Sequence, residues 1–149
     1  MNVNFIVPIK ASGTVWFAEL GQARLGLCPN SGWQISLRGK IKNILEPKDM
    51  IMLLPLLELG RQKVYDQLTE IAKNRKDVNA VEIFPETMLL KCAFEYSVSD
   101  YWPMAGLKWL ESSPQQLSNS LKDTLAELQK CSWAKQLLKQ KIKLILKRQ

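Results

Sequence analysis

The chain has 149 residues, of which 46% are hydrophobic and 23% charged, the composition of a folded globular protein of one domain. No stretch approaches the roughly 18 consecutive apolar residues of a membrane-spanning helix, and the absence of histidine excludes every Ser-His and Cys-His nucleophile pair. The net charge of +7 is concentrated at one end, because residues 114–149 hold eight basic and two acidic side chains.

Cysteine usage and the N-terminal residues indicate the compartment. Cys28, Cys92 and Cys131 are odd in number, lie far apart and form no C-x-x-C pair. We expect them to be small buried apolar residues rather than a disulfide or metal set. The first residues lack the basic segment of a signal peptide, and Lys10 interrupts the following apolar run too early. We therefore expect a cytoplasmic protein.

The N-terminal part of the chain has the pattern of short strands and turns. Alternating apolar residues over 3–9 predict a half-buried strand, which Pro8 would place at a sheet edge. Residues 14–17 and 33–37 are rich in β-branched and aromatic side chains, and 29–32 between them is a turn signal. We expect two to four short strands, too few to be stable without packing on other elements.

From Glu46 the apolar spacing becomes helical. Asp49 is a predicted N-cap, Pro55 interrupts the segment that follows, and Pro85 and Pro114 occupy predicted first helical positions. Ser99 or Asp100 is the predicted cap of another helix. The expected helices cover about 55–74, 85–97, 100–111, 114–128 and 131–149.

These elements predict one domain over residues 1–149, in which the strands and turns of 1–45 pack on the helical region 46–149. The short helices and their connections resemble α-helical repeat arrays of the HEAT type, in which helix pairs stack on one another. The resemblance covers about 100 residues, concerns the fold only, and carries over no functional residue. Because no sequence repeats at a fixed period, an irregular bundle is an equal alternative. The predicted class is mainly α with a small N-terminal β segment (α+β), an irregular helical bundle or short helix-pair array of about five helices.

No recognised catalytic or nucleotide-binding motif is present. The chain contains neither G-x-G-x-x-G nor G-x-x-x-x-G-K-[ST]. Cys28 is followed six positions later by Gln34, where a cysteine phosphatase would need arginine to bind the phosphoryl group.

Carboxylate pairs could act without histidine, as in glycosidases. Glu82 with Glu86, and Glu95 with Asp100, lie close in sequence but in no distinguishing context. No ligand cluster for zinc or calcium occurs. We predict no catalytic residue, no cofactor and no metal, and therefore a protein that is not an enzyme.

Five tryptophans are a high number for this length. Trp102 and Trp109 are seven residues apart and share a helix face, while Trp16 and Trp33 lie in the strand region. These tryptophans can be large core residues, or they can form an exposed aromatic patch that binds a partner.

A row of lysines runs along the last predicted helix. Lys135, Lys139, Lys143 and Lys147 recur at steps of four, which places them in one slanting row. From residue 130 to the end the chain has seven basic residues and no acidic one, so like charges repel without local compensation. The predicted partner-binding residues are Lys130, Trp133, Lys135, Lys139, Lys141, Lys143, Lys147 and Arg148. Residues of this helix expected to pack include Leu137, Ile142, Leu144 and Ile145, together with Trp133.

Four interpretations of the lysine row stay open. It can be a solvated basic face, because lysines near a helix C-terminus interact favourably with the macrodipole and their stems cover apolar surface. It can also bind an acidic protein, nucleic-acid phosphates or an anionic membrane. Lysine does not favour the bidentate base contacts of arginine, so nucleic-acid binding would be non-specific and salt-dependent.

Our first hypothesis is a non-enzymatic protein-interaction module that binds an acidic partner through this basic C-terminal helix. Small helical adaptors and the antitoxin or immunity proteins that block a toxin domain have this general character, an analogy at the level of the fold. The alternative is a non-specific nucleic-acid-binding accessory protein. The sequence predicts no oligomeric state.

Overall fold

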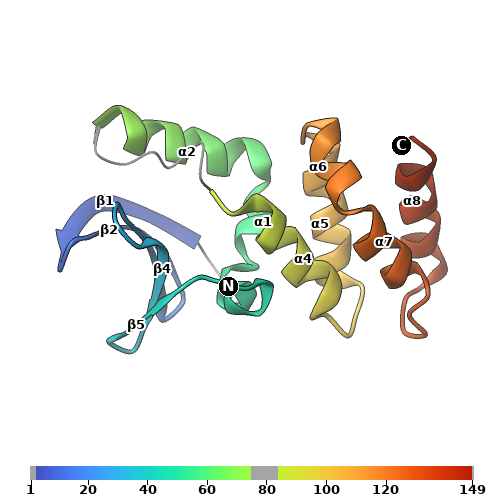
Figure 1. Cartoon of the computed structure of the whole chain (residues 1–149), viewed down its shortest axis with the longest axis horizontal. Coiled ribbons are helices and arrows are strands. Elements are labelled where there is room, and N and C mark those ends of the chain that lie inside the picture. The colour runs from blue at the N-terminus through green and yellow to red at the C-terminus, as the bar shows by residue number, and fades with distance from the viewer. Residues whose placement is uncertain (1–2, 75–83, 149) are drawn as a thin grey trace.

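The computed structural model describes residues 3–74 and 84–148 and has an α+β architecture. A five-stranded antiparallel sheet comes first in the chain, and helices follow it. Figure 1 shows the sheet at one end of the molecule and the C-terminal helix at the other. The α+β class is therefore confirmed. Residues 75–83, which include Glu82, lie outside the described residues.

The sheet is a meander in which each strand pairs with the next along the chain. Its strands are β1 (Val3–Ala11), β2 (Thr14–Leu20), β3 (Ala23–Cys28), β4 (Gly32–Leu37) and β5 (Lys40–Asn43). The first strand lies at an edge, as Pro8 predicts.

The expectation of two to four strands was wrong because β3 and β5 carry weak strand signals. β3 contains Gly26, yet a Cβ there would lie 2.5 Å from Cε3 of Trp16, so glycine lets this indole lie against the sheet. β5 is short, polar and exposed, and it forms because Arg38 and Gly39 both have positive φ, the backbone of a type I′ hairpin turn.

The helical region is divided more finely than the sequence predicts. It contains a 3-10 helix, η1 (Pro47–Leu53), and the α-helices α1 (Leu56–Leu59), α2 (Arg61–Asn74), α4 (Glu86–Glu95), α5 (Tyr101–Glu111), α6 (Gln115–Ser120), α7 (Lys122–Gln129) and α8 (Gln136–Lys147). The predicted helix over 55–74 breaks at Gly60, whose φ of 88° is outside the helical range. The estimate of about five helices is therefore too low for the described residues.

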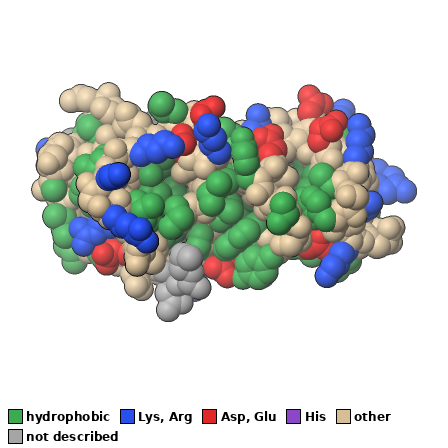
Figure 2. All heavy atoms as spheres, turned by 90° about the horizontal axis from the view of Figure 1, so that it is seen from below, with side chains coloured by type: hydrophobic (Ala, Val, Ile, Leu, Met, Phe, Trp, Pro, Cys, Tyr) green, Lys and Arg blue, Asp and Glu red, His purple; other side chains and the backbone are tan. Residues whose placement is uncertain are grey.

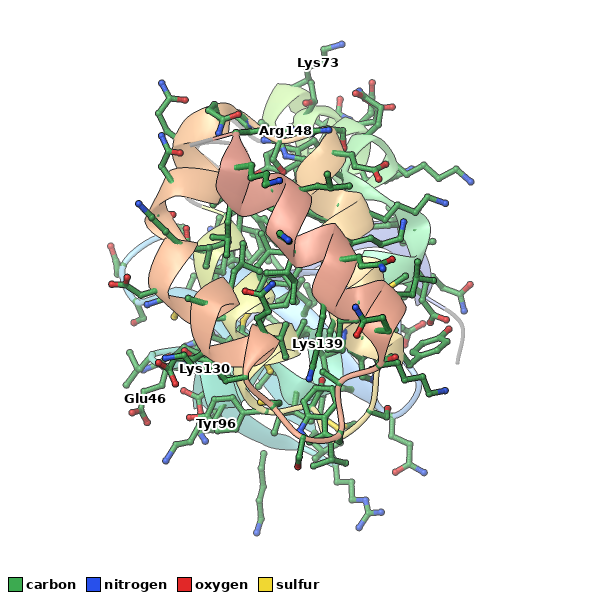
Figure 3. All side chains as sticks on the ribbon, turned by 90° about the vertical axis from the view of Figure 1, so that its right-hand side faces the viewer. Glu46, Lys73, Tyr96, Lys130, Lys139 and Arg148 are labelled. Atoms are coloured by element: carbon green, nitrogen blue, oxygen red, sulfur yellow. The ribbon has the colours of Figure 1, made fainter. Side chains whose placement is uncertain are left out.

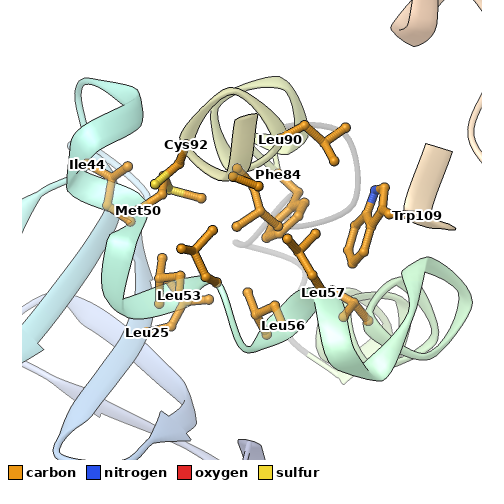
Figure 4. Packing of buried hydrophobic residues seen from close by; sticks show 14 of the residues in the cluster. Leu25, Ile44, Met50, Leu53, Leu56, Leu57, Phe84, Leu90, Cys92 and Trp109 are labelled. Carbon is orange, nitrogen blue, oxygen red and sulfur yellow. The ribbon is translucent and has the colours of Figure 1, made fainter. Parts of the chain in front are cut away.

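One hydrophobic core joins the sheet to the helices. Figure 4 shows Leu25 of the sheet beside Leu53 of η1, with Cys92 of α4 packed on Met50. An aromatic series crosses the same boundary: ring centroids are 5.6 Å apart between Phe17 and Trp33, and 5.4 Å apart between Trp33 and Phe84.

The prediction that Asp49 is an N-cap was wrong, because Asp49 lies inside η1. Glu46 is the N-cap, and the Asp49 carboxylate reaches back to accept the N–H groups of Leu45 and Glu46, both at 3.0 Å. The ammonium of Lys42 lies 2.7 Å from the other carboxylate oxygen. The carboxylate thus connects β5 to the start of the helical region.

We predict that the connection through Asp49 is lost in acid. The pKa of Asp49 is lowered from 3.8 to about 2, first by Lys42 and then by the two backbone N–H groups, against an opposing effect of burial. Because the folded-state pKa is the lower one, this stabilisation is complete above about pH 4 and disappears as the pH falls through about 2. Thermal unfolding followed by circular dichroism should therefore show a smaller loss of Tm over this range for Asp49→Asn than for the wild type. Asp66→Asn, on the exposed side of α2, is the control, and equal profiles for all three proteins would contradict the prediction.

Candidate protein-interaction surface

The helix that carries the lysine row is α8, at the end of the molecule opposite the sheet. It packs on α5 and α7. Leu138 and Ile142 are fully buried in that contact, and Ile145 and Leu146 are partly buried beside them. Figure 3 looks directly onto the outer side of α8, which no other described element covers.

The structure divides the predicted partner-binding residues into two groups. Lys139, Lys141, Lys143 and Lys147 lie within α8, and Arg148 is its C-cap. Lys143, Lys147 and Arg148 are exposed, whereas Lys139 and Lys141 are half-buried. Figure 3 shows Lys139 and Arg148 toward opposite ends of the helix.

The other three predicted residues do not lie in α8, because that helix begins at Gln136 rather than near residue 131. Lys130 is the C-cap of α7 and forms an ion pair with Glu127 at 3.3 Å. Trp133 is half-buried and packs against the core. Lys135 is the N-cap of α8 and has an extended backbone. The row therefore consists of three residues inside the helix and one at its start.

Electrostatics at the start of α8 differ from those at its end. The first turn contains no acidic residue, and Lys135 and Lys139 lie near the positive end of the helix macrodipole, which disfavours them. The carboxylate of Asp100, just before α5, supplies the missing acid and accepts the N–H of Lys135 at 3.3 Å. Asp100 is the N-cap residue of α5, as one of the two predicted alternatives has it, but its side chain makes no capping hydrogen bond in that helix.

Two leucines of α8 face outward instead of packing. The exposed fractions are 57% for Leu137 and 58% for Leu144. The expectation that both pack inward was wrong, because α5 and α7 cover the side of α8 that carries Leu138 and Ile142. Figure 2 shows Lys and Arg side chains at the end of the molecule that carries α8 and also over the sheet at the other end.

A groove of about 740 Å³ lies between α1, α5 and α8. Leu57, Met104, Ala105 and Leu107 are among its apolar lining residues, and Lys141 borders it from α8. Its charged residues are Glu58, Asp100, Lys108, Glu111 and Lys141. Acidic side chains thus outnumber basic ones, so this groove does not continue the basic surface of α8.

Glu86, which the sequence pairs with Glu82, belongs instead to a partly buried polar cluster. Its carboxylate lies 2.5 Å from Nε of Arg61 and accepts the indole N–H of Trp109 at 2.6 Å and the hydroxyl of Tyr65 at 3.1 Å. Burial, followed by Glu86, raises the pKa of Tyr65 to about 12. Since these donors occupy both oxygens, the carboxylate is a structural acceptor, and the sequence alone did not indicate its partners.

The tryptophans are mostly core residues. Trp16, Trp33 and Trp109 are buried, while Trp102 and Trp133 are half-buried. None of the five therefore forms an exposed aromatic patch in the described residues.

The cysteines are all free, but only Cys92 is fully buried. Cys28 and Cys131 are half-buried, which corrects the expectation of three buried residues. The backbone N–H of Asn30 and then the hydroxyl of Ser31 lower the pKa of the Cys28 thiol, whereas burial raises that of Cys92 to about 12.

We therefore predict unequal thiol reactivity. Iodoacetamide at about pH 8 should modify Cys28 several-fold faster than Cys92, because the thiolate is the nucleophile. Peptide mass spectrometry over a time course measures both rates, and the same reaction in denaturant is the control in which the difference should vanish. Equal rates in the folded protein would contradict the prediction.

Within residues 3–74 and 84–148, no three acidic or cysteine side chains lie close enough together to hold a metal ion. No helix in the same part of the chain is long and apolar enough to span a bilayer. Comparisons with protein-family models, curated proteins and solved structures found no match. The resemblance to HEAT-type arrays thus gains no support, and the five-stranded sheet is not a feature of such arrays.

Proposed function

We propose that the chain is a non-enzymatic protein-interaction module, of the adaptor or inhibitor kind, which binds an acidic protein through the outer side of α8. The observation that carries the proposal is the row of half-buried Lys139 and exposed Lys143 and Lys147 on a helix without any acidic residue. Neighbouring lysines at this spacing repel by a few tenths of a kcal/mol per pair. A partner with acidic side chains would relieve that repulsion and gain in association rate.

The proposal also includes the arrangement of the helices and the compartment in which the protein acts. We favour an irregular bundle over a helix-pair array, because α4 packs on η1, α5 and α7 rather than on one partner helix. The free cysteines support a cytoplasmic setting for the interaction.

Charge reversal tests the proposal. The variant Lys139→Glu/Lys143→Glu/Lys147→Glu should lose about tenfold or more of the acidic proteins that the wild type captures from nuclease-treated extract at physiological salt. The matched control reverses three lysines elsewhere, Lys40→Glu/Lys63→Glu/Lys122→Glu, and so has the same net charge. Quantitative mass spectrometry compares the captured proteins, and circular dichroism verifies that both variants are folded.

Three results would count against this function. Equal loss in both variants would mean that only total charge matters, and equal capture by all proteins would mean that α8 is not the binding surface. Capture from untreated extract that is absent from nuclease-treated extract would favour the alternative of non-specific nucleic-acid binding, which a steep salt dependence of DNA affinity would then demonstrate.

A further inference from the structure

The outer side of α8 carries an apolar line as well as charge. Leu137 and Leu144 are seven residues apart, so an α-helix brings them to nearly the same angle, about 10 Å apart along the axis. More than half of each side chain is exposed. The two leucines thus form a short apolar line between charged and polar side chains of the same helix.

Cations stand at fixed offsets on both sides of this line. Lys141 and Arg148 each follow a leucine by four residues and lie about 40° to one side of it. Lys147 follows Leu144 by three residues and lies about 60° to the other side, where Gln140 has the matching place beside Leu137. The leucines and the cations that follow them by four residues therefore repeat after seven residues, while the other side has one cation, Lys147. A seven-residue repeat with charged flanks is typical of helices that pair along a seam.

Resting on the proposed function, we infer that the acidic partner presents an amphipathic α-helix to α8. Apolar side chains of that helix would pack against Leu137 and Leu144, and its flanking carboxylates would meet Lys141, Lys147 and Arg148. A seven-residue spacing matches the turns of a second helix, whereas an extended strand repeats about every 7 Å. The opposite side of α8 already packs on α5 and α7, so the partner would add one more helix at this end of the molecule.

Two synthetic peptides of about 20 residues test this inference. The first is helical, with leucines in one stripe and glutamates beside it. The second has the same composition, charge and helical tendency, but its leucines are spread around the helix. Fluorescence anisotropy at physiological salt should show about tenfold tighter binding of the striped peptide to the wild type.

Leu137→Ala/Leu144→Ala should reduce the affinity for the striped peptide to that for the spread peptide. Because both side chains are exposed, this variant should fold normally, which its Tm verifies. Leu45 is 74% exposed and lies between β5 and η1, outside α8. Leu45→Ala is therefore the control and should bind like the wild type.

The outcomes separate the inference from the function on which it rests. If both peptides bind equally and the leucine variant is unaffected, the helix inference is wrong while acidic binding stands. If neither peptide binds, both are wrong. Leucine-dependent binding to phosphatidylserine-containing vesicles that exceeds binding to the striped peptide would overturn the inference in favour of a membrane surface.

Discussion

Glu86→Ala is expected to destabilise the protein by about 1–3 kcal/mol, the usual effect of leaving hydrogen-bond donors that are shielded from water without their acceptor. The side chains of Arg61 and Glu86 are only 21% and 12% exposed. Removing the carboxylate leaves the guanidinium of Arg61 and the indole N–H of Trp109 without their shared acceptor. Because these residues come from α2, α4 and α5, the loss should loosen the packing of all three helices.

Urea unfolding followed by circular dichroism measures this effect. Glu86→Gln keeps an acceptor of similar shape and should lose less stability than the alanine variant. Glu70→Ala removes an exposed carboxylate whose ion pair with Lys73 spans 3.8 Å, and it should change stability by no more than about 0.5 kcal/mol. A loss as small for Glu86→Ala as for Glu70→Ala would contradict the structural role of the cluster.

Trp33→Ala is expected to cost about 3–5 kcal/mol, because it removes a large buried side chain between the sheet and the helices. The ring is 6% exposed and packs edge-on against Phe17 of β2 and against Phe84, which precedes α4. Filling the cavity would require the sheet to move toward the helices, and the several other contacts of the core resist that movement.

The same variant tests the prediction of one domain over residues 1–149. Unfolding by urea should give coincident transitions by tryptophan fluorescence and by circular dichroism, both at a lower midpoint than in the wild type. Trp33→Phe retains an aromatic ring and should lose less stability. Two separated transitions in the wild type would instead mean that the sheet and the helical region unfold independently.

Local signals predicted the helical region better than the sheet. Pro85 and Pro114 each stand one residue before the first helical position, within a residue of the prediction. Helix starts depend on a few neighbouring residues, which the sequence displays directly. Strand β5 was missed because its residues are polar and exposed, and only pairing with β4 makes it a strand.

At the candidate surface, too, the sequence predicted the local pattern of residues but not the contacts between distant parts of the chain. The sequence by itself determined the absence of histidine, the four-residue spacing of the lysines and the lack of acid along α8. The tertiary structure decided which side of that helix is buried. Apolar residues occupy more of its circumference than one contact can cover, so packing on α5 and α7 buries Leu138 and Ile142 and leaves Leu137 and Leu144 outside.

Only the tertiary structure could bring Asp100 to the start of α8 or join Glu86 to Arg61 and Trp109. These partners are 23 or more residues apart in the chain. Periodicity fixes the angle of a side chain on its own helix, but not the neighbour that it meets. The lysine row is thus a property of the sequence, whereas its position on an uncovered surface beside two leucines is a property of the fold.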